Sequence, residues 1–457
     1  MNQRETTERR TFLKVLGGLG AAAVTGAPVL RALAEDKTTT SDEFFVLIHA
    51  QGGWDVTLWS DPRNEDKGLV DPATDKLVNT EGLRRWVDDA EVRPGERTFK
   101  KVQPAGSKLV FGPGIGDLAD LYDRITLFNG VAVNTVSHPD GTAFAATGRH
   151  LAGGRVPASS LDSLLANEFG TGQLLPAVSV RFPSAFLGQD LDRRAMPLLV
   201  DGIGSMGRSL ARSNANTTVA DRDAVTALLT QEAKDLAARA HDPGAMNGFA
   251  LQLSALTKML GGPVQQIFDT TKLKAAQPTF DYTGRFMGAF APNFAFAVEA
   301  MKANLVRCVS FAMGSFDTHT SNYTDHGLKL QETFDQITEL VRVLDATPHP
   351  TRTGHKLSEH THVIVVSEFC RTPQINLTGG RDHYPNGSAL VISPKFRGNT
   401  VLGSSDLEQM LPISSRTFGD GLRAATPADV IATVLGAFGI DPRKYMRDGE
   451  VIKEVLR

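Results

Sequence analysis

The chain has 457 residues, of which 41% are hydrophobic and 22% charged, and its formal net charge is −3. This composition excludes a disordered or fibrous protein, and it lacks the basic excess that marks a nucleic-acid-binding protein. The two cysteines, Cys308 and Cys370, are too few for a disulfide framework. We therefore expect a globular protein with two free thiols and no nucleic-acid partner.

The first 34 residues have the pattern of an export signal. Arg9 and Arg10 open a twin-arginine motif, an apolar stretch rich in small residues follows, and Ala34 closes a cleavage box. The apolar stretch is shorter than the roughly 20 residues of a membrane span. We predict cleavage after Ala34, export of the folded protein by the twin-arginine translocase, a periplasmic or extracellular location, and no membrane span after cleavage.

The mature chain begins with a buried type of strand at residues 44–50. Gly52 and Gly53 permit a sharp turn after it, and Asp55 then lies at the carboxyl end of the strand. Asp55 is either a functional carboxylate or the cap of a turn or helix. Residues 60–106 and residues 201–275 are predicted to be insertions, the second of them largely helical.

A second strand, predicted at residues 125–133, leads to Ser137 and His138 at the start of an alanine-rich helix. A hydroxyl and an imidazole at a helix N-terminus suit a nucleophile or an anion site. The alternative is a capping serine beside an exposed histidine. Local sequence does not decide between them.

Two later strands, at residues 307–313 and 362–367, also end in polar side chains. Asp317 and His319 follow the first, and a carboxylate with an imidazole is a ligand pair that Zn²⁺ or Mn²⁺ accepts. Glu368 follows the second, and a glycine-rich loop then carries Asp382 and His383. Between the two strands, a helix is predicted from apolar residues at helical spacing, and the polar loop 348–359 is expected to be solvated.

These continuous apolar strands predict an α/β fold, a three-layer sandwich around a mostly parallel central sheet. The carboxyl ends of parallel strands meet at one edge, where ligands bind in open α/β sheets. Carboxylates and imidazoles gathered there need a cation to organise them. The expected cofactor is therefore one or two divalent metal ions, with Zn, Mn, Ca and Mg all left open.

Four motifs in the chain match a known family: Gly52-Gly53-Trp54-Asp55, Phe316-Asp317-Thr318-His319, Ser367-Glu368-Phe369-Cys370-Arg371 and Asp382-His383. Over nearly all its mature length the chain resembles the exported bacterial family called domain of unknown function 1501. That family in turn is similar to the alkaline phosphatase and sulfatase superfamily. The resemblance implies a single alkaline phosphatase-like domain over residues 35–457. It assigns metal contacts to Asp55, Asp317, His319, Glu368 and His383. Asp382, the other residue of the last motif, is a further metal candidate.

The sequence also departs from the superfamily pattern. Phe369 occupies the place of a second histidine ligand, Cys370 replaces a glycine, and Tyr384 follows the Asp-His pair. These departures would weaken or remove one metal subsite. The segment beginning at Ser137 has Gly141 where a formylglycine sulfatase needs arginine, so that class is disfavoured. Asp382 either contacts the metal or orients His383 from behind.

The favoured function is an exported metal-dependent hydrolase of a phosphate or sulfate ester, or of a related small anionic substrate. In this hypothesis Ser137 is the nucleophile, His138 is a ligand or proton donor, and Arg371 pairs with the anion. Arg371 is equally suited to a structural salt bridge. Two other functions remain open: a non-catalytic envelope protein that binds a protein partner through a degenerate metal site, and a periplasmic metal carrier.

Overall fold

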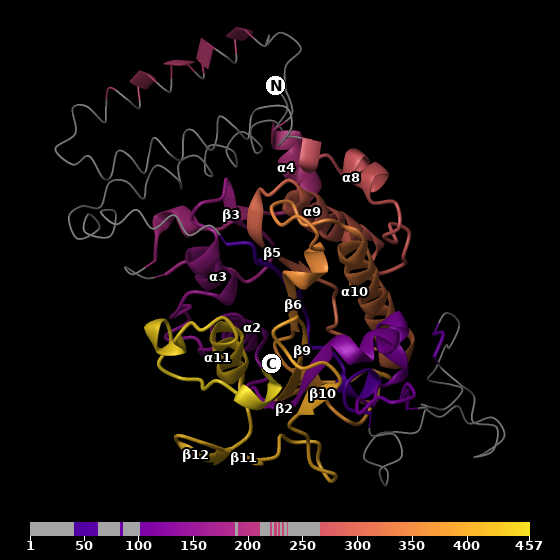
Figure 1. Ribbon diagram of the computed structural model, residues 1–457. Helices are drawn as coiled ribbons and strands as arrows, with labels where there is room; N and C mark the ends of the chain where they lie inside the picture. Colours follow the sequence, from indigo (N-terminus) through magenta and orange to yellow (C-terminus); the bar gives the residue numbers. More distant parts are fainter. Residues whose placement is uncertain are drawn as a thin grey trace.

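The computed structural model describes residues 41–62, 83–85, 101–187, 191–210 and 266–457, together with a few helical residues between 220 and 235. Within them the central sheet has eight strands in the order β10-β2-β9-β6-β1-β5-β3-β4 (Figure 1). Their bounds are β1 Phe44–Ala50, β2 Ile125–Ala132, β3 Leu175–Val180, β4 Leu198–Val200, β5 Val306–Met313, β6 Thr361–Val366, β9 Asn386–Ile392 and β10 Thr400–Leu402.

All strands of this sheet are parallel to one another except β9. β1 lies at its centre and pairs in parallel with β5 and β6, so that Val46 lies opposite Val309 on one side and Val363 on the other. β9 is antiparallel to both of its neighbours, β2 and β6. β1 and β5 are buried at every position, as expected of strands covered on both faces. The predicted mostly parallel sheet is confirmed.

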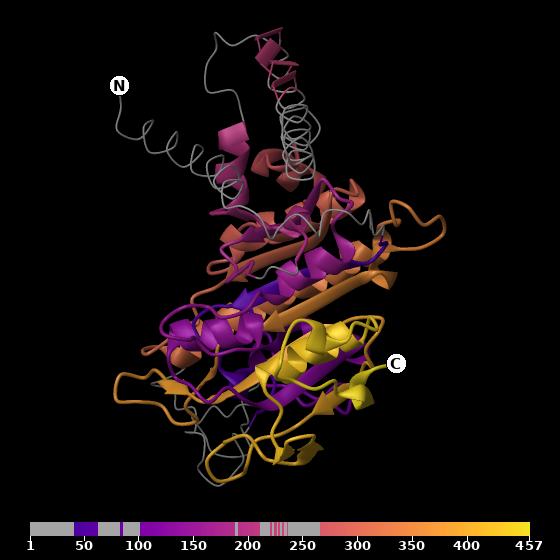
Figure 2. The same ribbon diagram turned by 90° about the vertical axis from the view of Figure 1, so that its left-hand side faces the viewer.

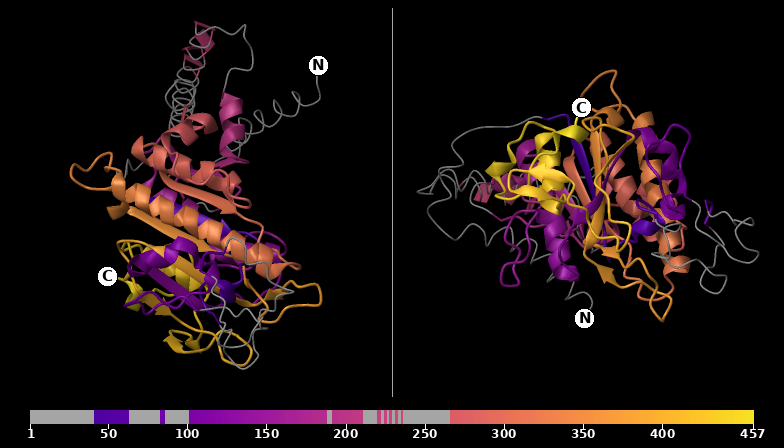
Figure 3. Two further views of the ribbon diagram at one scale, coloured as in Figure 1. Left: turned by 90° about the vertical axis from the view of Figure 1, so that its right-hand side faces the viewer. Right: turned by 90° about the horizontal axis from the view of Figure 1, so that it is seen from below.

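Helices cover both faces of the sheet. One face carries α9 (Ala291–Lys302), α10 (Gly327–Ala346) and the 3₁₀ segment η3 (Pro113–Arg124). The other carries α2 (His138–Thr147), α3 (Leu161–Phe169) and α11 (Pro427–Gly436). Figure 2 shows the second face toward the viewer, and Figure 3 shows the first face and the layers seen from below. The predicted three-layer α/β sandwich is therefore observed.

The two cores separate along each strand because successive side chains point to opposite faces. In β1, Phe44, Val46 and Ile48 belong to the core under α9 and α10. Phe45 and Leu47 belong to the core under α3 and α11. The apolar face predicted for the helix after β5 is buried in α10, from Leu330 through Leu344.

Smaller elements complete the described part of the chain. α4 (Ile203–Leu210) and α8 (Thr270–Ala276) pack against α9. Two short antiparallel pairs lie outside the main sheet, β7 (Cys370–Arg371) with β8 (His383–Tyr384) and β11 (Arg416–Phe418) with β12 (Gly421–Arg423). Cys308 and Cys370 are free and buried, so the predicted absence of a disulfide between them is confirmed.

Several predictions concern residues that the structure does not describe. The leader, residues 1–34, lies outside the described residues, as do most of both predicted insertions, so their boundaries stay predictions. Among the described helices, none is long and apolar enough to cross a membrane.

One prediction for the loop 348–359 is wrong. His349 is buried rather than solvated, because the loop folds back and its Nε2 donates to the carbonyl of Asp42 at 2.9 Å.

Candidate metal centre at the carboxyl edge

Side chains from four separate segments meet at the carboxyl edge of the parallel strands. β2 delivers His138 through the start of α2, and β5 delivers Asp317 and His319. His383 arrives differently, because β9 is antiparallel and therefore begins at this edge. β8, which holds His383, pairs with β7 so that His383 lies opposite Arg371.

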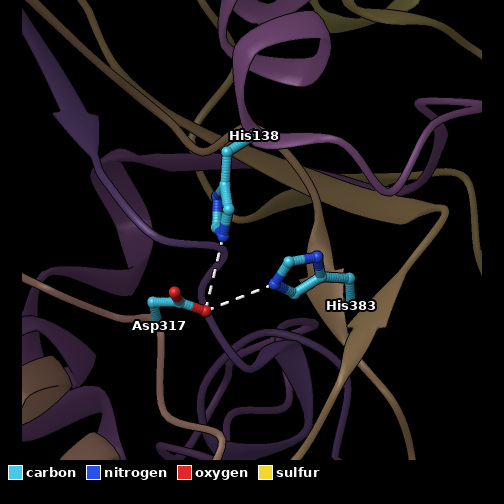
Figure 4. A group of neighbouring side chains, drawn as sticks. All are labelled: His138, Asp317 and His383. Carbon is cyan, nitrogen blue, oxygen red and sulfur yellow. Dashed lines mark hydrogen bonds and ion pairs between the residues drawn. The ribbon is translucent and has the colours of Figure 1, made fainter.

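Three imidazoles point toward one oxygen of Asp317. Its Oδ1 lies 3.1 Å from Nε2 of His319, 3.3 Å from Nε2 of His383 and 3.4 Å from Nε2 of His138. Figure 4 shows His138 and His383 approaching the carboxylate from two different elements. Nε2 of His319 and Nε2 of His383 are only 3.0 Å apart. The cluster thus brings four potential ligand atoms together.

The second nitrogen of each ring fixes which nitrogen carries the proton. Each Nδ1 faces an oxygen that can only accept, because carbonyls and ionised carboxylates have no proton to donate. In the neutral rings the Nδ1 atoms therefore carry the hydrogens, and the Nε2 lone pairs face one another and Asp317. Histidines that bind metals are held in this way. The Nδ1 contacts are His138 to Glu368 Oε1 at 2.9 Å, His319 to Asp382 Oδ1 at 2.7 Å, and His383 to the Val136 carbonyl at 2.8 Å.

His138 adds a further sign that the cluster needs a cation. Its Nε2 is buried and has no hydrogen-bond partner among the described residues. The pKa of His138 is raised, chiefly by its hydrogen bond to Glu368. A divalent ion would satisfy the ligand atoms of His138, Asp317 and His383 together, because these atoms all lie within 4.8 Å of one another.

Arg371 is the partner of Asp317. Its Nη2 lies 2.6 Å from Asp317 Oδ1 and also donates to the carbonyl of Gly52. Its Nε donates to the carbonyl of Gly53 at 2.9 Å, and its Nη1 to that of Arg381 at 3.1 Å. Burial raises the pKa of Asp317, but the hydrogen bond and charge of Arg371 outweigh it and lower the pKa to about 2. Arg371 is fully buried and ion-paired with Asp317, an environment that fits the structural salt bridge, one of the two roles left open by the sequence.

Glu368 lies behind His138 rather than beside Asp317. Its Oε1 accepts from the backbone N–H of Gly52 at 2.7 Å as well as from His138, and its Oε2 accepts from Ser367 Oγ at 3.0 Å. Burial raises the pKa of Glu368, but the His138 hydrogen bond and the charge of His49 lower it to about 2. The sequence predicts Glu368 as a metal ligand, whereas the structure makes it the residue that positions His138.

His49 is a site residue that the sequence analysis does not single out. It is the next-to-last residue of β1, and its Nε2 lies 3.4 Å from Glu368 Oε2. Burial lowers the pKa of His49, although the nearby Glu368 carboxylate acts in the opposite direction. A histidine at the end of an otherwise apolar strand is the sequence feature that could have indicated it.

Asp55 does not join the cluster. The structure gives it the capping role, because its Oδ1 accepts from the backbone N–H and hydroxyl of Thr57 at the start of η2 (Val56–Leu58). Its Oδ2 accepts from Asn322 Nδ2 at 2.7 Å and lies 3.4 Å from Arg381 Nε. Its backbone N–H donates to His326 Nε2 at 2.7 Å. The predicted ligand role therefore has no geometric support here.

Asp382 lies at the surface and orients a ring, but not the predicted one. Its Oδ1 holds Nδ1 of His319 and also accepts from Asn376 Nδ2 at 3.2 Å. The hydrogen bond to His319 lowers the pKa of Asp382 and keeps it ionised. Of the two roles left open by the sequence, the structure favours orientation, with His319 in place of His383.

Ser137 is exposed at the N-cap of α2, and its side chain makes no capping hydrogen bond. Within the described residues, no hydrogen bond links its hydroxyl to the metal-ligand cluster, which consists of His138, Asp317, His319 and His383. It stands directly before His138 and directly after Val136, whose carbonyl anchors His383. Ser137 is thus beside the cluster in the chain, with a hydroxyl that stays available.

Phe369 packs against two of the imidazoles at this edge. Its ring centroid lies 4.9 Å from that of His138 and 4.6 Å from that of His383. Among the described residues, the group at this edge whose ligand atoms lie within 4.8 Å of one another comprises His138, Asp317 and His383. His319 adjoins it through Asp317 and His383. The described geometry accommodates one ion.

Comparison with known proteins adds a family and a distant likeness. The model of a family described as "Protein of unknown function (DUF1501)" matches residues 44–450. No match was found among curated proteins. Among solved structures, the chain is similar to a mutant of TAB5 alkaline phosphatase with Mg bound in its M3 site. That similarity has 10% sequence identity and a TM-score of 0.33, over 88% of this chain and 99% of the other.

Proposed function

The chain belongs to the family of proteins of unknown function 1501, and from its metal-ligand cluster we propose that it is an exported metal-dependent hydrolase of a phosphate or sulfate ester or a related anionic substrate. One observation carries the proposal. Three imidazoles, each held through Nδ1, direct Nε2 at the same oxygen of Asp317. This arrangement suits a cation open to solvent on one side, because Asp317 and His319 are half exposed.

The residues that would hold the ion are His138, His319, His383 and Asp317. Ligand sets rich in imidazole favour Zn²⁺, whereas Mg²⁺ and Ca²⁺ prefer sets made of oxygen atoms. A bound divalent ion of this kind polarises an ester oxygen and activates a water molecule or hydroxyl group. The ion would also supply the positive charge for an anionic substrate, because Arg371 is committed to Asp317.

The chain's own residues divide the remaining roles. Glu368, Asp382 and the Val136 carbonyl each accept at Nδ1 of one ring, which turns the Nε2 atoms toward Asp317 and makes them more basic ligands. Ser137 is the candidate nucleophile, because its exposed hydroxyl stands at the N-terminus of α2, where backbone N–H groups favour negative charge. His138 acts as a ligand in this proposal, since its Nε2 faces Asp317.

Metal content tests the proposal directly. Inductively coupled plasma mass spectrometry on mature protein, exported by its own route, should find near-stoichiometric metal at the carboxyl edge. The Asp317→Ala/His383→Ala double variant should lose that metal, and the wild type should hydrolyse members of a panel of phosphate and sulfate esters. Equal metal content in the wild type and the double variant would overturn the proposal.

A non-catalytic envelope protein is the second candidate, and two observations favour it. Arg371 is locked on Asp317, and Phe369 replaces a possible imidazole beside His383. Ser137→Ala separates the candidates. In the hydrolase, ester cleavage falls while metal content is kept. A metal-loaded wild type that cleaves no ester in the panel would support the binding protein, for which the expected ligand is an envelope protein.

The export part of the proposal depends on residues 1–34. Replacing the twin arginines, Arg9→Lys with Arg10→Lys, should retain the protein in the cytoplasm, because the translocase recognises this pair. Cell fractionation would measure the result. A variant that is exported as efficiently as the wild type would contradict use of the twin-arginine translocase.

A further inference from the structure

We propose that His355, Glu359 and His360 form a second divalent-metal site, of the zinc type, at the opposite, amino edge of the sheet. Nδ1 of His355 lies 3.1 Å from Nε2 of His360 and 2.9 Å from Oε2 of Glu359. The three ligand atoms all lie within 4.8 Å of one another. The location is fixed by the backbone, since the carbonyl of His360 accepts from Phe44 N–H at the start of β1. This site is independent of the proposed hydrolase function.

The turn that carries these residues is held by its own hydrogen bonds. Glu359 ends the 3₁₀ segment η7 (Leu357–Glu359), and its Oε1 accepts from the backbone N–H of Lys356 at 2.9 Å. The backbone N–H of His349 donates to the carbonyl of His355, also at 2.9 Å. Glu359 therefore uses one carboxylate oxygen for the turn and turns the other toward His355. The ligands are preorganised by the loop itself.

His360 supplies the second, independent observation. The residue is only 7% exposed, and its buried Nδ1 has no hydrogen-bond partner among the described residues. Glu43 Oε1 lies 3.7 Å from this Nδ1, beyond a hydrogen bond. A histidine that binds metal through Nε2 directs Nδ1–H toward a carboxylate. A small movement on metal binding would thus pair Nδ1 with Glu43 and present Nε2 to the ion.

Neighbouring histidines are committed elsewhere and serve as supports. His349 accepts at Nδ1 from the backbone N–H of Arg352 and donates from Nε2 to the Asp42 carbonyl, and its ring lies 4.8 Å from that of His360. His362 contacts Glu43 Oε2 through Nε2 at 2.7 Å. His349 and His362 therefore do not count as ligands, and the site has three protein ligands: His355, Glu359 and His360.

Two imidazoles and one carboxylate are a ligand set that Zn²⁺ accepts, and they leave a fourth position for water. In the absence of an ion, the same three atoms could be held by one His355 Nδ1 proton shared between Glu359 and His360. Zinc binding distinguishes these two states. The ion would fasten the turn at 355–360 to the beginning of β6.

The test uses a background in which the carboxyl-edge ligands are removed, Asp317→Ala/His383→Ala. Zinc titrated into this protein and followed by isothermal calorimetry should bind with about one equivalent. Adding His355→Ala should abolish this binding. Adding His150→Ala instead should leave it unchanged, because His150 contacts Asp140 and belongs to neither cluster. A folded background protein that binds no zinc, or equal binding after His355→Ala, would overturn the proposal.

A second variant guards against misfolding. In the otherwise wild-type protein, Glu359→Gln keeps an oxygen for the Lys356 N–H and removes only the charge. Its zinc affinity at this site should fall about tenfold or more, while the thermal unfolding temperature without metal stays close to that of the wild type. Unchanged zinc affinity in this variant would show that Glu359 is not a ligand. Ester hydrolysis tests only the proposed function at the carboxyl edge, and zinc binding in these variants tests only the site at the amino edge. Either proposal can therefore be contradicted without the other.

Discussion

The two histidine clusters at opposite edges of the sheet are assembled in different ways. At the carboxyl edge, His138 and Glu368 are 230 residues apart in the chain, and His319 and Asp382 are 63 apart. At the amino edge, His355 and His360 are separated by five. The first geometry exists only when the whole sheet is assembled, whereas the second is set by one hydrogen-bonded turn. Perturbing the sheet should therefore affect the two clusters unequally.

The largest effect is expected from Gly52→Ala. Gly52 has φ +112°, and a Cβ added there would lie 2.5 Å from the backbone nitrogen of Asp317. The change should displace Asp317, cost about 3 kcal/mol of unfolding free energy and abolish metal binding at the carboxyl edge only. Urea unfolding and metal analysis would measure both.

The matched control for Gly52 lies in the amino-edge loop. Gly354 also has positive φ, +84°, but nothing lies within 4 Å of an added Cβ. Gly354→Ala should cost only about 1 kcal/mol of backbone strain. Equal destabilisation by the two alanines would show that the crowding at Asp317 is unimportant.

Arg371→Ala comes next in size. It removes the donors that bind Asp317 and the carbonyls of Gly53 and Arg381. Half-exposed Asp317 can recover water, so we expect a loss of about 2–4 kcal/mol, mostly from the buried carbonyls. Urea denaturation measures it, with Arg371→Lys as the charge-preserving control. A stable alanine variant would argue against a structural role for this ion pair.

Acid should also act on the carboxyl edge. The pKa of Glu368 is lowered to about 2 in the folded protein, so its stabilising contribution is present above its unfolded pKa, about 4.5, and is lost as the pH falls through 2. The buried carboxylate should account for about 3 kcal/mol over this range. Glu368→Gln should show a shallower loss of stability between pH 4.5 and 2. Parallel pH profiles for both proteins would contradict the assignment.

The smallest change is Asp382→Asn, which removes the surface charge that orients His319 and contacts Asn376. Metal affinity at the carboxyl edge should fall about tenfold, and zinc binding at the amino edge should not change. Asp441→Asn is the control, because Asp441 is a surface carboxylate that pairs with Arg443. If both variants lowered metal affinity equally, the effect would be one of overall charge.

The sequence predicts the strands better than the partners of the strand-end side chains. Apolar runs identify β1, β5 and β6, and the polar residues after β5 lie in the cluster. Asp55 and Glu368 look like the same kind of strand-end carboxylate as Asp317. What distinguishes them is contact with Arg381, His49 and other residues far away in the chain, which no local pattern marks. The direction of β9 is equally hidden, because a short apolar run reads the same in either direction.

The antiparallel β9 also has a kinetic consequence. It lies between β2 and β6, strands separated by more than two hundred residues, so this part of the sheet closes only through non-local contacts, which form slowly. His138 follows β2 and His383 precedes β9, and neither can reach Asp317 until both strands are inserted. We therefore expect the carboxyl-edge ligands to meet late in folding, after the β1–β5–β6 centre has formed. Metal uptake in a refolding experiment should follow the slowest phase, and a bound ion would then slow unfolding of the finished sheet.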